Sequence, residues 1–317
     1  MRALALLGAI TLAVAACGGG SKSRADAAFL MASPAGLVTL DAQGRVIGRL
    51  VELPKDSAPA SPSLFPDGSA IAFSITLPPK GATGFGSDIY AVNIDGTQLR
   101  PLVEHEHENV FYASPHVDPK GSAIYFHRRA AIIQNGTYVG NEDSIERLDL
   151  ATKQRTRVVE GAADPALHPD GKSIAYVRYV DGQPRGLWRV GTDGRDPRPF
   201  FTIPDTWWYL QAPRFSPDGK TLIFSGAGHN AKVQAAPHGL AHLGIPSELY
   251  AAAADGSSVR AVAQTSDDVV PAWSPDGAQI AFIGLGALNV VALADGNVRQ
   301  LSRGNDFFFG DLIWLRH

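Results

Sequence analysis

Short runs of alternating apolar and polar residues recur along the chain, and turn-forming residues separate them. The runs flank turns, and in several repeats a continuous apolar triplet also follows a Pro-Asp-Gly sequence, such as Ile71-Ala72-Phe73 and Ile280-Ala281-Phe282. Alternation with a period of two predicts β-strands, because successive side chains of a strand point to opposite faces. The pattern therefore predicts an all-β chain.

The runs belong to a repeat that returns about every 50 residues, which is the scale of repeat architectures. Five segments end in Pro-Asp-Gly or Pro-Lys-Gly, and their glycines are Gly68, Gly121, Gly171, Gly219 and Gly277. Proline presets φ, aspartate bonds the backbone that follows, and glycine accepts a positive φ, so each segment predicts a tight turn. A second strand pair follows around turns such as Asp193-Gly194. Each repeat thus predicts a four-stranded antiparallel blade of a β-propeller.

The two ends of the chain complete the pattern. The segment 29–50 predicts a blade that lacks its first strand, and 311–315 predicts a first strand with nothing after it. Pairing between these segments would form a sixth blade and leave no long strand edge unpaired. We therefore predict a six-bladed β-propeller that is closed by its C-terminal strand.

The motif Pro-x-aromatic-Ser-Pro-Asp-Gly followed by Ile-Ala-Phe, as in 271–282, resembles the TolB-like propeller repeat, which is related to WD repeats. The resemblance covers residues 28–317 and implies a propeller without the additional N-terminal α/β domain of TolB itself. The same repeat occurs in propellers of prolyl-oligopeptidase-type enzymes, which carry a hydrolase domain. This sequence contains no Gly-x-Ser-x-Gly nucleophile elbow. We therefore predict that the chain is not an enzyme.

The N-terminus has the features of a bacterial export signal. Met1-Arg2 precedes an apolar run over 3–16, which is short for a membrane-spanning helix. Val14-Ala15-Ala16-Cys17 resembles a lipobox, which implies cleavage before Cys17 and its acylation by palmitate-type chains. We predict a signal peptide over 1–16 and a tether over 17–27; the alternative is an ordinary signal peptide with an incidental cysteine. The absence of Asp at position 18 favours the periplasmic side of the outer membrane.

Composition narrows the functional classes. A net charge of −3 and a pI near 6.3 argue against nucleic acid as a partner. One cysteine excludes an intramolecular disulfide, an iron–sulfur cluster and a thiolate zinc site, so we predict no cofactor. The 33 glycines and 22 prolines exceed ordinary usage and match two tight turns in each blade.

Blade topology sorts the connections between two faces. Turns between the first and second and between the third and fourth strands share one face, the turn face. Connections between the second and third strands and between blades share the other, the loop face, where functional loops are expected. The candidate binding residues are aromatic residues of two inter-blade segments and two polar residues of innermost strands; they are Trp207, Trp208, Tyr209, Phe307, Phe308, His116 and Arg214. For each residue, packing between blades is the alternative.

Histidines raise a second functional possibility. His229, His238 and His242 lie in a long insertion of the fifth blade, and His105 and His107 alternate with glutamates over 104–109. Imidazole and carboxylate suit zinc or manganese, so a metal-dependent lyase or hydrolase is the alternative function. For the segment 104–109, a solvated acidic loop is the competing interpretation. The favoured function is a lipid-anchored envelope propeller that binds a protein, or a glycan or peptide, through its loop face.

Lipidation is directly testable. Replacing Cys17 by alanine removes the only thiol of the chain. We expect the variant to lose both fatty-acid labelling and sedimentation with membranes, because acyl chains supply about 0.8 kcal/mol of membrane binding per buried CH₂ group. A variant that remains labelled and membrane-bound would contradict the lipobox interpretation.

Overall fold

The computed structural model describes residues 26–79, 84–202, 207–229, 247–265, 268–304, 307 and 311–315. The predicted signal peptide, Cys17 and most of the tether lie outside these ranges, as do His238, His242 and Phe308. Within these ranges, no helix is long and apolar enough to cross a membrane.

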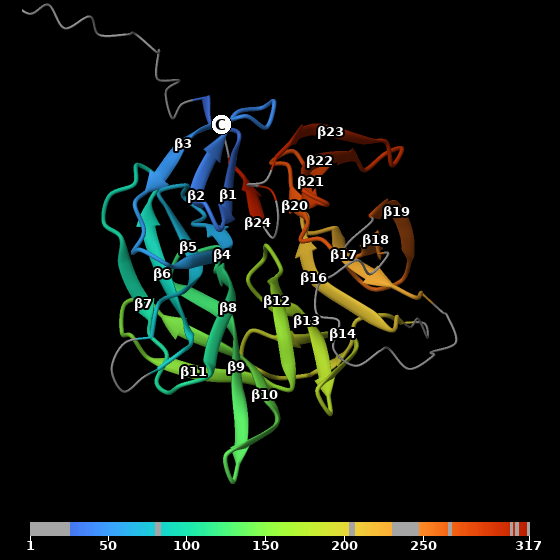
Figure 1. Cartoon of the computed structure of the whole chain (residues 1–317). Coiled ribbons are helices and arrows are strands. Elements are labelled where there is room, and N and C mark those ends of the chain that lie inside the picture. Colours follow the sequence, from blue (N-terminus) through green and yellow to red (C-terminus); the bar gives the residue numbers. More distant parts are fainter. Residues whose placement is uncertain are drawn as a thin grey trace, which may run out of the picture.

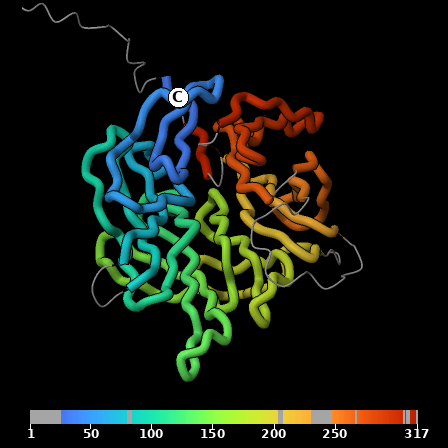
Figure 2. The backbone as a smooth tube through the Cα atoms, in the orientation of Figure 1, coloured from blue at the N-terminus to red at the C-terminus, as the bar shows by residue number. Residues whose placement is uncertain are grey.

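The described residues form four-stranded antiparallel sheets that are arranged around a common axis (Figures 1 and 2). Four of these sheets are separate. Two further four-stranded units are joined into one eight-stranded sheet by a parallel bridge between Ser87 and Phe111. The predicted all-β propeller of six four-stranded blades is confirmed.

The blades are numbered in chain order, and their strands are given from the innermost outward. Blade 1 contains β24 (Asp311–Trp314), β1 (Phe29–Ser33), β2 (Gly36–Leu40) and β3 (Val46–Val51). Blade 2 contains β4 (Ala58–Leu64), β5 (Ala70–Thr76), β6 (Ser87–Asn93) and β7 (Arg100–Val103). Blade 3 contains β8 (Val110–Val117), β9 (Ala123–Gln134), β10 (Thr137–Asp149) and β11 (Arg155–Glu160).

The remaining blades follow the same order. Blade 4 contains β12 (Ala162–Leu167), β13 (Ser173–Val180), β14 (Gln183–Gly191) and β15 (Arg198–Pro199). Blade 5 contains β16 (Tyr209–Phe215), β17 (Thr221–Ala227), β18 (Ser247–Ala253) and β19 (Val259–Thr265). Blade 6 contains β20 (Ala272–Trp273), β21 (Gln279–Gly284), β22 (Ala287–Ala292) and β23 (Val298–Arg303).

Closure of the ring occurs as the sequence predicts. The C-terminal strand β24 pairs antiparallel with β1, from Phe29 opposite Trp314 to Ala32 opposite Asp311. The rings of Phe29 and Trp314 lie 4.7 Å apart between their centroids. The first blade is therefore built from both ends of the propeller.

The Pro-Asp-Gly segments form the turns that their residues predict. In blade 2, the Gly68 amide donates to the Phe65 carbonyl at 2.9 Å, and Gly68 has a φ of 72°. The Asp67 carboxylate accepts the Ser69 amide at 3.0 Å, which holds the turn. Neighbouring turns meet, since His168 Nε2 of blade 4 lies 3.0 Å from the Gly219 carbonyl oxygen of blade 5. These aspartates thus serve turn formation.

The hydrophobic core consists of six layers, and each layer lies between two neighbouring blades. Alternate residues of one strand enter different layers. In β13, Ile174 and Tyr176 pack in the layer shared with blade 3, whereas Ala175 and Val177 pack in the layer shared with blade 5. Both faces of the second strand of each blade are therefore buried, which explains the continuous apolar runs that follow the turns.

The connection between blades 2 and 3 carries a half-buried ionic network. The Glu106 carboxylate accepts hydrogen bonds from the Tyr112 hydroxyl and from Arg128, whose Nη2 lies 2.9 Å away. Arg155 Nη2 lies 3.4 Å from the same carboxylate. Burial opposes ionisation, but these hydrogen bonds and the charge of Arg155 outweigh it and lower the pKa of Glu106 from 4.5 to about 2.

This network predicts an acid-sensitive contribution to stability. The folded pKa of Glu106 lies below its ordinary value, so the stabilisation is present above pH 4.5 and is lost as the pH falls towards about 2. We expect Glu106→Gln to lower the free energy of unfolding by about 1 kcal/mol at pH 7, allowing for solvent screening. The difference from the wild type should shrink as the pH falls, as measured by urea unfolding at several pH values. The exposed Glu108→Gln is the matched control, and a difference independent of pH would contradict the assignment.

Candidate functional site

The innermost strands of four blades share an unusual backbone feature. A non-glycine residue with positive φ stands immediately before a proline, and the antiparallel register shifts there by a β-bulge. These residues are Ser61, Ser114, Asp164 and Ala212, with φ values of 50°, 48°, 48° and 49°. A non-glycine residue rarely adopts this conformation without support from its surroundings. Because the feature recurs in four blades, we expect interactions around the axis to stabilise this backbone conformation.

Two aspartates support three of these four residues by joining the innermost strands of different blades. The Asp311 carboxylate in β24 accepts the Ser61 amide of β4 at 2.9 Å and its hydroxyl at 3.2 Å. The Asp164 carboxylate in β12 accepts the Ser114 hydroxyl of β8 and the Ala212 amide of β16, both at 3.3 Å. Burial raises the pKa of Asp311, although the bonds from Ser61 oppose the rise.

Arg214, on the innermost strand β16, interacts with these carboxylates, and His116, on the innermost strand β8, interacts with Arg214. Arg214 Nη1 donates to the Pro213 carbonyl at 2.7 Å, and its guanidinium interacts through its charge with Asp164 and Asp311. Burial, assisted by the charge of Arg214, holds the pKa of His116 well below 6.5, so the imidazole is neutral at pH 7. The axis therefore presents a cation, two carboxylates and a neutral imidazole from four different blades.

A second polar group lies where β16 begins, at the loop face. The Tyr209 hydroxyl lies 2.7 Å from Gln211 Oε1 and 3.2 Å from Asp268 Oδ2. Gln211 Nε2 also donates to Asp268 Oδ2 at 3.3 Å. Burial and the charge of Asp268 raise the pKa of Tyr209, so its hydroxyl remains protonated and can donate.

A third polar group lies at the base of the β9–β10 hairpin. The Asp143 carboxylate lies 2.7 Å from His127 Nε2 and accepts Arg129 Nε at 2.7 Å. Burial opposes ionisation of Asp143, but the His127 hydrogen bond and the Arg129 charge lower its pKa. Arg129 also lies over the ring of Tyr179 in β13, at 5.5 Å from its centroid. These contacts fix the hairpin base against blade 4.

The aromatic candidates fall into different environments. Trp207 is only 6% exposed and packs between blades 4 and 5, with its ring 5.1 Å from Phe224. Phe307 is 5% exposed and packs between blades 6 and 1. Trp208 and Tyr209 are half-buried. Of the described aromatic candidates, only these two retain side-chain surface for a ligand.

The described histidines do not form a metal site. His229 stacks on Trp207 at 4.5 Å between ring centroids, and its proposed companions lie outside the described residues. His105 Nδ1 lies 2.6 Å from the Asp88 carboxylate, which also accepts the His105 amide. No group of three metal-ligating side chains occurs within the described ranges.

One feature of the loop face is absent from the candidates that the sequence suggested. The strands β9 and β10 continue past their neighbours and form a two-stranded hairpin that projects from blade 3 (Figure 1). Four apolar side chains near its tip are exposed: Ile132 by 40%, Ile133 by 49%, Tyr138 by 58% and Val139 by 52%. The Asn135-Gly136 turn between two alternating runs is the sequence signal that could have revealed it.

The sequence matches no protein-family model and no curated protein sequence. The structure is similar to TolB from Acinetobacter baumannii, with 19% identity and a TM-score of 0.64 over 91% of this chain and 66% of that chain. A puromycin-hydrolyzing peptidase from Mycobacterium tuberculosis has 17% identity and a TM-score of 0.56, over 84% of this chain and 42% of that one. Hydrazine synthase from Kuenenia stuttgartiensis has 15% identity and a TM-score of 0.51, over 81% of this chain and 70% of that one.

These similarities establish a TolB-like β-propeller fold. This chain spans just under two thirds of the TolB chain and less than half of the peptidase. The prediction that the chain is not an enzyme is wrong as an inference from its fold, because the similar structures include a peptidase and a hydrazine synthase. The missing nucleophile elbow excludes one catalytic motif, whereas a propeller supports many activities through its loops.

The two neighbouring tryptophans predict contrasting effects on stability. Trp207→Ala removes a ring from the layer between blades 4 and 5 and should lower the free energy of unfolding by about 3–5 kcal/mol. Trp208→Ala, at a half-buried position, should lower the free energy of unfolding by about 1–2 kcal/mol. Chemical denaturation of both variants gives the comparison, and equal losses would contradict the assignment of Trp207 to the core.

Proposed function

We propose that this protein is a binding scaffold of the bacterial cell envelope, held to a membrane by lipid on Cys17, and that its loop face binds a protein partner. The projecting β9–β10 hairpin carries this proposal. Residues 130–141 contain no charged side chain, and four large apolar side chains of this segment are exposed. Exposed apolar patches on a folded protein are typical of interaction surfaces.

The hairpin has the properties of a contact element. A two-stranded ribbon has little stability of its own, but the Asp143, His127 and Arg129 contacts at its base hold this one in place. Ile133 and Tyr138 are cross-strand partners, so they present a combined apolar surface on one face of the ribbon. An apolar, uncharged tip suits a protein surface better than a heavily hydroxylated glycan.

The position of the N-terminus favours a protein over the anchoring membrane as the partner. In each blade, the second strand begins at the turn face, so the chain enters β1 at the turn face. The β9–β10 hairpin connects the second and third strands of blade 3, so it projects from the loop face, opposite to the turn face. A lipid on Cys17 would therefore be joined to the propeller at its turn face, the face opposite to the hairpin.

Site-specific photocrosslinking tests the proposal. With a benzophenone side chain at position 138 of the full chain in its native envelope, we expect a discrete crosslinked protein adduct. The same side chain at Lys153, an exposed residue of the turn face, should give no such adduct. Ile133→Ser should reduce the adduct at least tenfold and change the free energy of unfolding by about 0.5 kcal/mol or less, because the residue is exposed. Equal adducts from both positions, or no adduct from position 138, would contradict the proposal.

A further inference from the structure

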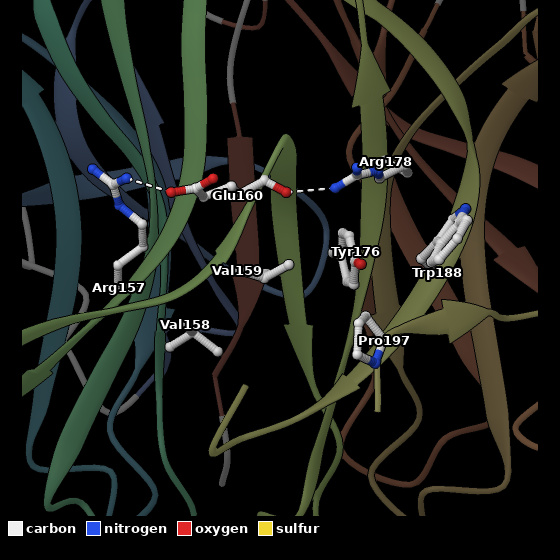
Figure 3. A pocket seen from close by; sticks show the side chains of 8 residues that line it. All are labelled: Arg157, Val158, Val159, Glu160, Tyr176, Arg178, Trp188 and Pro197. Carbon is white, nitrogen blue, oxygen red and sulfur yellow. Dashed lines mark hydrogen bonds and ion pairs between the residues drawn. The ribbon is translucent and has the colours of Figure 1, made fainter. Parts of the chain in front are cut away.

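A groove of about 440 Å³ lies on the outer side of the ring, between blades 3 and 4 (Figure 3). Its apolar lining comes from β11 of blade 3 and from blade 4, and comprises Val158, Val159, Tyr176, Trp188 and Pro197. The sequence suggests no role for these residues, and the groove is separate from the β9–β10 hairpin tip and from the polar groups at the axis.

The floor of the groove contains a buried hydroxyl without a partner. Tyr176 is 0% exposed, and none of the hydrogen-bonding groups in the described ranges reaches its hydroxyl. Burial raises the pKa of Tyr176, so the hydroxyl is a protonated donor at neutral pH. A buried polar group left unpaired costs about 1–3 kcal/mol, and most such groups in proteins are satisfied. The Tyr176 hydroxyl can therefore donate a hydrogen bond to an acceptor atom of a ligand in the groove.

Arg178 provides positive charge beside this hydroxyl. Its Nη1 donates to the Glu160 carbonyl at 2.6 Å, and its guanidinium lies 5.7 Å from the centre of the Trp188 ring. Within the described residues, no carboxylate forms an ion pair with Arg178. Arg157, across the groove, differs because it pairs with both Glu142 and Glu160, at 3.0 and 2.7 Å.

The outer edge of blade 4 is also open beside the groove. Its fourth strand, β15, contains only two residues and pairs with β14 only at Trp188 and Arg189. Among the described residues, Gln183 to Gly186 of β14 have no strand on their outer side. An unpaired edge of this kind accommodates an extended chain more readily than a compact ligand.

We propose that this inter-blade groove binds an extended peptide segment through a carboxylate, which accepts hydrogen bonds from Arg178 and the Tyr176 hydroxyl. The apolar side chain next to the carboxylate lies against Trp188 and Pro197. Access to the Tyr176 hydroxyl requires side chains of the lining to move, and the Arg178 guanidinium beside it is held by a hydrogen bond to the Glu160 carbonyl and by contact with the Trp188 ring. The carboxylate comes from an acidic side chain or from a peptide C-terminus.

Three small peptides test the proposal with the full chain. N-acetyl-Glu-Leu-amide offers a side-chain carboxylate, N-acetyl-leucine offers a terminal one, and N-acetyl-Gln-Leu-amide offers neither. Binding is followed by NMR of the tryptophan indole signals, with the Trp188 signal assigned from Trp188→Phe. We expect a saturable shift of the Trp188 signal with at least one carboxylate probe and at least tenfold weaker binding of the glutamine probe. Whichever carboxylate probe binds more tightly shows whether the groove prefers an acidic side chain or a peptide C-terminus.

Variants distinguish residues that bind the ligand from residues that only stabilise the fold. Arg178→Gln should weaken binding of the preferred probe at least tenfold, whereas Arg299→Gln, on the exposed outer strand of blade 6, should leave it unchanged. Tyr176→Phe should weaken binding at least threefold without lowering the melting temperature, because it removes an unpaired hydroxyl. Equal binding of the glutamate and glutamine probes, full affinity in Arg178→Gln, or a destabilised Tyr176→Phe would overturn the proposal. Ile133→Ser should not affect binding of the peptide probes to the groove. The groove proposal and the hairpin proposal can therefore fail independently of each other.

Discussion

The structure depends on burial of both faces of the second strand in every blade. In β5, Ile71 and Phe73 pack against blade 1, whereas Ala72 between them packs against blade 3. The same alternation in β17 sends Phe224 towards blade 4 and Ile223 towards blade 6. Each blade therefore contributes to two core layers, and no blade has a core of its own. A ring in which every layer is shared loses part of its apolar burial when any blade is missing, which makes closure by β24 essential.

The ring brings polar groups of different blades into proximity at the axis. Asp164 and Asp311 bond serine hydroxyls and backbone amides of neighbouring innermost strands, and these bonds support the positive φ of residues such as Ser61 and Ala212. The charge of Arg214 partly balances the two carboxylates and disfavours protonation of His116. The axis thus combines a structural role with a set of groups able to donate to and accept from a ligand.

Surfaces available for binding occur where the blades depart from their common pattern. In blade 3, β9 and β10 outgrow their neighbours and form the projecting hairpin; in blade 4, β15 is so short that the edge of β14 remains open. The similarity to both TolB and a peptidase shows that the regular part of the fold does not select an activity. The surfaces that we propose for binding therefore lie in the irregular segments of the blades rather than in their common pattern.

Local chemistry in the sequence was sufficient for the architecture. Pro-Asp-Gly determines a turn through the φ of its residues and the bonds of its aspartate, and strand alternation sets which residues are buried, so the blades and the pairing of β24 with β1 were predictable. Only the tertiary structure decided that Trp207 lies in a core layer and that Ile133 and Tyr138 are exposed. It also decided that the Tyr176 hydroxyl, near Arg178, finds no hydrogen-bonding partner among the residues that the structure describes. These outcomes depend on how far strands extend past their neighbours and on which side chains of two blades meet, and such non-local contacts leave no periodic signal in the sequence.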